Sequence, residues 1–70
     1  MEANLSKFEK SEVLVGTFED GLLKGTLVSS DLNGNLVLRE VKRVSKGLET
    51  EEELGHQFVR GDSVSFVALL

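Results

Sequence analysis

Two short polar stretches carry the side chains of this 70-residue chain that are best suited to binding chemistry. The first is the bend over residues 29–35, where the Asn35 amide can both donate and accept hydrogen bonds. Such an amide suits the Watson–Crick edge of a base such as uracil, which presents one N–H between two carbonyls. The second is residues 60–62, where the planar guanidinium of Arg60 can stack on a base or meet a phosphate. We expect the two stretches to meet in the fold and form one small binding site.

Two aspartates accompany these groups and could hold them in position. Asp31 lies in the first stretch and Asp62 in the second, and each carboxylate can accept N–H bonds from the groups beside it. A simpler interpretation is also open, because Asp and Asn are ordinary turn formers and Arg60 could be an ordinary surface residue. Local composition alone favours this simpler interpretation.

Catalytic chemistry has little support in the sequence. The chain has no cysteine, and its single histidine, His56, lies in a predicted strand with no nucleophile beside it in sequence. No Gly-rich loop matches a Walker or dinucleotide-binding pattern. Residues 60–62, Arg-Gly-Asp, also match a known adhesion motif. We expect no secretion signal in this chain, so we set the adhesion interpretation aside. We therefore expect no enzyme activity, no catalytic residues, no metal site and no cofactor.

Length and composition predict a single domain over residues 1–70 that depends on partner subunits. A chain this short buries only about 60% of the surface that its unfolded form exposes, so a lone core is marginal. The absence of Cys excludes disulfides, and a single His argues against a zinc site, which leaves oligomerisation as the means of stabilising the fold. The net charge is −4, so any binding of nucleic acid must use a local site. No apolar run approaches the roughly 20 residues of a membrane span, and we expect no contact with a membrane.

The elements that must position the two bends are a short helix and five strands. Leu5 and Phe8 are spaced to share one helix face within residues 1–10, with Asn4 as the N-cap. The Asp20-Gly21 pair predicts a hairpin turn, because Gly adopts positive φ without steric cost. The expected strands span residues 12–19, 22–29, 35–44, 54–60 and 63–70.

Side-chain alternation indicates which residues face the core. In the first strand two phases are open, with either Val13 and Val15 or Leu14 and Phe18 facing inward. In the second strand, Leu23 and Leu27 share a face with Gly25, where a glycine permits sharp curvature.

In the third strand, Leu36 and Leu38 lie on one face, and strict alternation places Val41 on the other. The polar, glutamate-rich residues 45–53 are expected to form a hairpin loop flanked by solvated strand ends. Five strands of this length suit a strongly bent, partly open barrel, which gives a mainly β fold class. The last strand has no charge after Asp62 and would aggregate as a free edge, so we expect another chain to pair with it.

These features together resemble the Sm and Sm-like RNA-binding family over roughly residues 5–69. The first motif of that family corresponds to Gly25-Thr26-Leu27, Asp31, Gly34 and Asn35, followed by the apolar strand 36–38. The second corresponds to residues 58–64, Phe-Val-Arg-Gly-Asp-Ser-Val. Asp20-Gly21 lies one place later than the usual turn of the family, which favours the Val13/Val15 phase of the first strand.

The resemblance implies a ring of six or seven subunits that binds U-rich single-stranded RNA in its central pore. Asn35 would hydrogen-bond the base, Arg60 would stack on it, and Gly61 would allow close approach of the backbone. The position of Asn33 commonly carries the opposite stacking group in the family, and that of Gly34 is often Met. The implied RNA-binding residues are Asn33, Asn35, Arg60 and Gly61, and the implied supporting residues are Asp31, Gly34 and Asp62.

The resemblance also implies that identical or paralogous subunits join by pairing residues 54–60 with residues 63–69 of a neighbour. The ring would act in RNA processing, splicing or decay inside the cell, in the nucleus or cytoplasm of a eukaryote or the cytoplasm of an archaeon. A second hypothesis is a ring-forming protein-assembly subunit whose nucleotide pocket is weakened or lost. A peptide-binding barrel is disfavoured because the chain has four Phe and no Trp or Tyr.

Overall fold

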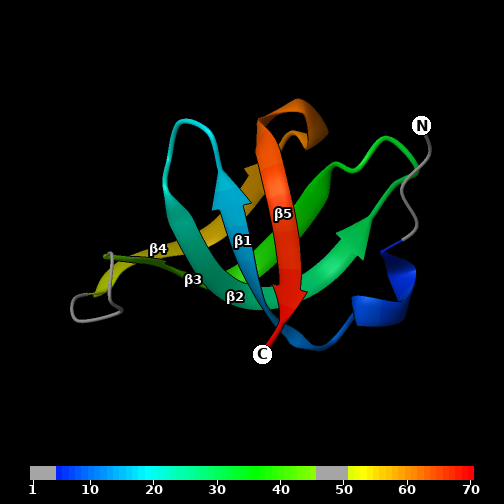
Figure 1. Ribbon diagram of the computed structural model, residues 1–70. Helices are drawn as coiled ribbons and strands as arrows, with labels where there is room; N and C mark the ends of the chain where they lie inside the picture. The colour runs from blue at the N-terminus through cyan, green and yellow to red at the C-terminus, as the bar shows by residue number, and fades with distance from the viewer. Residues whose placement is uncertain (1–4, 46–50) are drawn as a thin grey trace.

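The computed structural model describes residues 5–45 and 51–70, which form one curved antiparallel sheet (Figure 1). The order across the sheet is β4-β3-β2-β1-β5, so β5 returns past the other strands to pair with β1. The sheet is not closed, because β4 and β5 form its two edges and do not pair with each other. The expected bent, partly open, mainly β architecture is confirmed. Its strands are β1 (Glu12–Thr17), β2 (Leu22–Ser30), β3 (Leu36–Val44), β4 (Glu51–Val59) and β5 (Val64–Leu69).

The core consists of aliphatic side chains from four of the five strands. Val13 and Val15 are fully buried, opposite Gly25 and Leu23 of β2, so the favoured phase of the first strand is confirmed. Phe18 lies beyond the end of β1 and is exposed. The buried cluster comprises Val13, Val15, Leu23, Leu27, Leu36, Leu38, Val41 and Val59.

One facing prediction in β3 is wrong, since Val41 lies in the core together with Leu36 and Leu38. The register with β4 shifts between Leu38 and Val41, and Glu40 has a φ of 53°. Here β3 advances by three residues while β4 advances by two, so β3 contains one extra residue. A bulge of this kind returns the next apolar side chain to the same face and bends the strand, which strict alternation does not predict.

The N-terminal segment contains a single turn of 3-10 helix, η1 (Ser6–Phe8). Leu5 precedes this turn and Phe8 ends it, and both side chains are partly buried and pack against the core. The expected N-cap, Asn4, lies outside the described residues. Across residues 5–45 and 51–70, no helix has the length and apolar character to cross a membrane.

The fourth strand begins three residues earlier than predicted, at Glu51, so the last three residues of the stretch 45–53 are a solvated strand end that belongs to β4. Residues 46–50 lie outside the described part. Glu51, Glu52 and Glu53 pair in register with Val44, Arg43 and Lys42 of β3. Two ion pairs, Arg43–Glu52 and Lys42–Glu51, connect β3 and β4 in this part of the hairpin. Each contact is exposed, and such pairs contribute roughly 0–1 kcal/mol.

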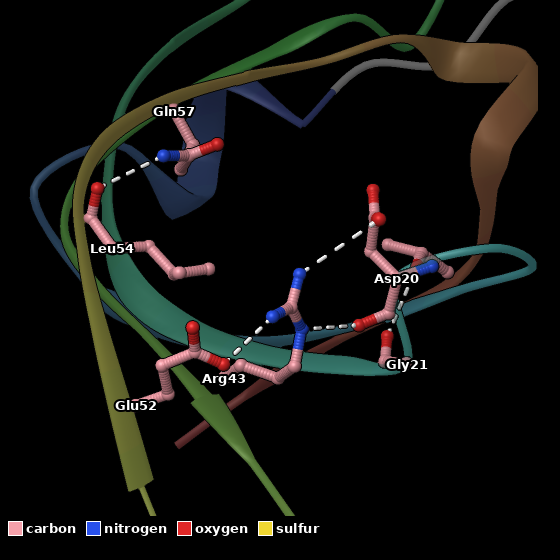
Figure 2. A network of polar contacts seen from close by, with 7 residues as sticks. Asp20, Gly21, Arg43, Glu52, Leu54 and Gln57 are labelled. Atoms are coloured by element: carbon pink, nitrogen blue, oxygen red, sulfur yellow. Dashed lines mark hydrogen bonds and ion pairs between the residues drawn. The ribbon is translucent and has the colours of Figure 1, made fainter.

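Arg43 connects three parts of the fold at this end of the sheet, as Figure 2 shows. Its Nη1 lies 2.8 Å from Glu52 Oε1 on β4, and its Nε donates to the Asp20 carbonyl oxygen at 3.0 Å. Asp20 belongs to the predicted β1–β2 turn, in which Gly21 has a φ of 75°. Thr17 closes that turn by donating its hydroxyl to the Gly21 carbonyl oxygen at 2.7 Å. The turn is therefore attached to β3.

Candidate nucleic-acid interface

The two bends that carry the candidate binding residues are in direct contact. The backbone N–H of Gly61 donates to Asn35 Oδ1 at 2.7 Å, and this bond joins positions 26 residues apart in the sequence. Because β2 continues to Ser30, the first bend in the structure is residues 31–35, between β2 and β3, and the second lies between β4 and β5. The expectation that the fold brings them together is confirmed.

The Asp31 carboxylate organises the first bend. Its Oδ1 accepts the backbone N–H groups of Asn33 at 2.9 Å and Asn35 at 3.0 Å. Its Oδ2 accepts the Asn35 side-chain Nδ2 at 2.9 Å. Gly34 completes the bend with a φ of 82°, which glycine adopts without steric cost, and its N–H donates to the Asp31 carbonyl oxygen at 3.0 Å. Bends of this kind, in which an Asp side chain binds the backbone a few residues ahead, form from local sequence.

The hydrogen bonds to Asp31 also stabilise its charged form. The Asn35 side-chain amide, followed by the backbone N–H of Asn35, lowers the pKa of the Asp31 carboxyl below its ordinary value. The carboxylate therefore stays ionised to a lower pH than an ordinary aspartate does. A protonated carboxyl group would carry a hydrogen on one of its oxygens, whereas both oxygens of the ionised form are free to accept these three N–H bonds.

The second bend is the 3-10 turn η2 (Gly61–Ser63), which follows an extended Arg60. The Ser63 N–H donates to the Arg60 carbonyl oxygen at 3.0 Å. Arg60 Nη2 lies 3.0 Å from Asp62 Oδ2, with 72% of the Arg60 side chain and 68% of the Asp62 side chain exposed. Asp62 thus orients one end of the guanidinium while leaving most of that side chain accessible.

Position 61 requires glycine, because the space between the two bends is too small for a side chain. A Cβ at this position would lie 2.1 Å from the Asn33 carbonyl oxygen and 3.0 Å from the Gly34 carbonyl carbon. Both neighbours are backbone atoms and cannot move aside without moving the first bend. Any side chain at position 61 would therefore push the two bends apart.

The contact between the bends also fixes the Asn35 amide. Its Oδ1 faces an N–H and its Nδ2 faces a carboxylate, so the opposite orientation of the amide would lose both bonds. One N–H and one lone pair remain for a ligand. Asn33 is exposed, and its side-chain amide makes no hydrogen bond within the described part of the chain. The site thus combines a fixed amide with one planar cation.

The structure places all seven predicted site residues in these two bends, and their roles toward RNA stay predictions. Sequence reasoning gave Asp31 a supporting role, and in the structure its carboxylate accepts three hydrogen bonds from Asn33 and Asn35. The spacing of Asp31 to Asn33 and Asn35, typical of an Asp-centred turn, was the signal for this role. The Cβ clash at Gly61 has no local signal, because the atoms involved are distant in sequence.

Three solved structures illustrate what this chain is similar to. A heptameric archaeal Sm protein is 26% identical, with 91% of each chain covered and a TM-score of 0.82. A chain of the NatC complex bound to CoA is 28% identical over 97% of this chain and 86% of that chain, with a TM-score of 0.81. A Pyrococcus abyssii Sm protein in complex with a uridine heptamer has a TM-score of 0.79, with 91% of this chain and 89% of that chain covered. Its identity is 23%, so it supports the fold alone.

A comparison with curated protein sequences returns no match. The family model of the LSM domain matches residues 3–69, which is nearly the whole chain. This match agrees with the five-stranded fold and with both sequence motifs. The chain belongs to the LSM domain family of Sm and Sm-like proteins.

Proposed function

We propose that this chain is a subunit of a six- or seven-membered Sm-like ring that binds U-rich single-stranded RNA in its central pore. The observation that carries the proposal is the Gly61–Asn35 hydrogen bond, which holds a fixed amide beside an exposed Arg60. The amide can pair with a base edge, and the guanidinium can stack on the base. The similarity to a heptameric archaeal Sm protein supports the ring.

Ring assembly would use the two edge strands, with residues 54–60 of one subunit pairing with residues 63–69 of the next. β5 carries no charged residue from Val64 to Leu69. Large apolar side chains are exposed on both edges, 65% for Phe58 on β4 and 45% for Phe66 on β5. Strand pairing would cover these groups and satisfy the free backbone groups of both edges.

The ring also reconciles RNA binding with an acidic chain. A single subunit has a net charge of −4 and one exposed arginine in the site. Several copies or paralogues would bring one arginine each to the pore and add their local fields. The protein would act without catalysis, as a scaffold for RNA processing, splicing or decay inside the cell.

Two measurements test this proposal: the native mass of the purified protein and its affinity for oligo-uridine. We expect several times the monomer mass, and weaker binding when Arg60 or Asn35 is replaced by Ala with the mass unchanged. Base stacking contributes about 1–3 kcal/mol per base, so Arg60→Ala should weaken binding by about 5- to 150-fold for each base that loses its stacking partner.

Arg60→Lys is the matched control, because lysine keeps the charge and lacks the planar stacking face. It should bind more weakly than the parent if stacking matters. Parent-like affinity of both Ala variants would refute the assignment of the pocket.

A second candidate is a subunit for protein assembly whose nucleotide pocket is weakened or lost. Asn33 and Gly34 favour it, because neither offers a stacking surface opposite Arg60. A chain of the NatC complex, similar over 97% of this chain, also supports it. An assembled protein that retains no U-rich RNA even at low salt would favour this candidate.

A further inference from the structure

Three of the four phenylalanines of this chain lie on its surface. Phe18 after β1, Phe58 on β4 and Phe66 on β5 are 72%, 65% and 45% exposed, whereas Phe8 packs against the core. Phe58 and Phe66 lie on the two edge strands, which the proposed ring would pair. Phe18 lies on neither edge, and it is the most exposed large apolar side chain of residues 5–45 and 51–70. The pairing of the edges alone gives it no role.

The backbone of Phe18 continues the pairing of β1 with β5. Its N–H donates to the Ser63 carbonyl oxygen at 2.9 Å, one step beyond the last paired residues of the two strands. Val15 is fully buried, so alternation along the chain turns Gly16 and Phe18 to the opposite face of the sheet. We call this opposite face the outer face. Phe18 therefore lies on the outer face, beside the first residues of β5.

Phe66 shares the outer face with Phe18, and Gly16 makes room for it. Gly16 lies opposite Phe66 in the β1–β5 register, and a Cβ at Gly16 would overlap the Phe66 ring and lie 2.8 Å from Ser65 Oγ. Between Gly16 and Thr17, β1 advances by one residue while β5 advances by two, so Ser65 is the extra residue of a bulge. Next to Phe18, β5 therefore presents one aromatic ring and one small side chain.

Phe58 lies on the outer face at the other edge of the sheet. Its neighbour Val59 is buried in the core, so alternation turns Phe58 away from the core. In the proposed ring, β4 of one subunit runs antiparallel to β5 of the next. The last residues of β4 then lie beside the first residues of β5. This arrangement brings Phe58 to Ser65 and Phe66 of the adjacent subunit, on the same face.

We propose that Phe18 is a contact between subunits outside the edge strands, which packs with Phe66 against Phe58 of the adjacent subunit. The choice of a second copy as the partner rests on the proposed ring. Paired strands lie about 4.8 Å apart, so Phe18 and the neighbour's Phe58 would flank β5 with their backbones about 10 Å apart. Two aromatic side chains can meet across that distance over the small Ser65. Neither β5 nor residues 57–59 of β4 carry a charge that the contact would bury.

The test measures the assembly of Phe18→Ser by native mass over a range of protein concentrations. Because Phe18 is 72% exposed in the single chain, the variant should fold as the parent does, with the same midpoint of urea unfolding. An aromatic pair changes an equilibrium constant by about 2- to 13-fold, so the variant should assemble only at a concentration about tenfold higher. Phe18→Tyr keeps the aromatic ring and should assemble as the parent does.

Val28→Ser is the matched control for Phe18→Ser. It removes a 44% exposed apolar side chain from β2, an interior strand that the ring does not pair, so assembly should not change. Equal weakening of assembly by Val28→Ser and Phe18→Ser would overturn the proposal, as would parent-like assembly of Phe18→Ser. Weak assembly of Phe18→Tyr would overturn the assignment of an aromatic contact.

A double variant identifies the partner of Phe18. Phe18→Ser/Phe58→Ser should weaken assembly by less than the product of the two single effects, because either substitution alone already removes the contact. Effects that multiply in full would overturn the pairing of Phe18 with Phe58. A parent that stays monomeric at every concentration would refute the ring and this contact together, whereas an assembling parent matched by Phe18→Ser would refute the contact alone.

Discussion

The two bends of the candidate site are held in different ways. The first bend, residues 31–35, contains three bonds to the Asp31 carboxylate and one to its carbonyl oxygen. The second has the Ser63–Arg60 backbone bond and an exposed Arg60–Asp62 ion pair. Its hydrogen bond to the first bend comes from the Gly61 N–H. The first bend supports itself, and the second is positioned against it.

This difference matches the chemistry that each bend offers. Hydrogen bonding to a base edge requires fixed donor and acceptor positions, and the rigid first bend carries the amide. Stacking and charge attraction tolerate more variation in geometry, and the exposed Arg60 supplies them from the second bend. Base selectivity should therefore depend on the first bend and affinity on both.

The largest effect is expected from Gly61→Ala, which separates the bends. The added Cβ cannot fit 2.1 Å from the Asn33 carbonyl oxygen, so the Asn35–Gly61 bond breaks. Overpacking of this kind costs about 1–3 kcal/mol in the free energy of unfolding, and oligo-uridine binding should be abolished. Chemical denaturation and binding titration measure the two effects.

Gly21→Ala is the control for Gly61→Ala. Gly21 has a φ of 75° with open space around it, so its replacement costs about 1 kcal/mol through backbone strain and leaves the site intact. If Gly61→Ala bound RNA as well as Gly21→Ala, the contact between the bends would not matter for binding.

A smaller effect is expected from Asp31→Ala, which removes the acceptor for three N–H bonds. The Asn35 amide would lose its fixed orientation, and oligo-uridine binding should weaken by about tenfold, the equivalent of one charge-assisted hydrogen bond. Hydrogen exchange of the Asn33 and Asn35 amides should accelerate. Unchanged exchange would show that the first bend does not depend on Asp31.

The pH dependence of stability tests the same carboxylate. Because the folded protein lowers the pKa of Asp31, this group stabilises the fold fully above its unfolded pKa of about 4. That contribution disappears as the pH falls through the lower folded pKa. The unfolding free energies of the parent and Asp31→Asn should therefore converge below about pH 4. A difference that stays constant from pH 7 to pH 3 would contradict this account.

The smallest effect is expected from Asp62→Asn in the second bend. Exposed ion pairs contribute roughly 0–1 kcal/mol, so stability should hardly change and binding should weaken by at most about fivefold. Urea unfolding measures the stability of Asp62→Asn and Asp31→Asn, and RNA titration compares their affinities. If Asp62→Asn lost more RNA affinity than Asp31→Asn, the second bend would matter more for binding than the first, contrary to this prediction.

The amino-acid sequence by itself determined the features that depend on near neighbours. Asp31 and Gly34 specify the first bend through contacts within four residues. Alternation placed Leu23 and Leu27 in the core, and the Asp20-Gly21 turn was predicted because it requires only local φ values.

Only the tertiary structure decided the features that depend on register between strands. The bulge at Glu40 places Val41 in the core, and the pairing of Glu51–Glu53 with β3 extends β4. The need for glycine at position 61 and the contact of Arg43 with Asp20 arise between residues more than twenty positions apart. Hydrogen bonding and packing across the sheet create these contacts, and a local pattern contains no information on which distant residue will lie opposite.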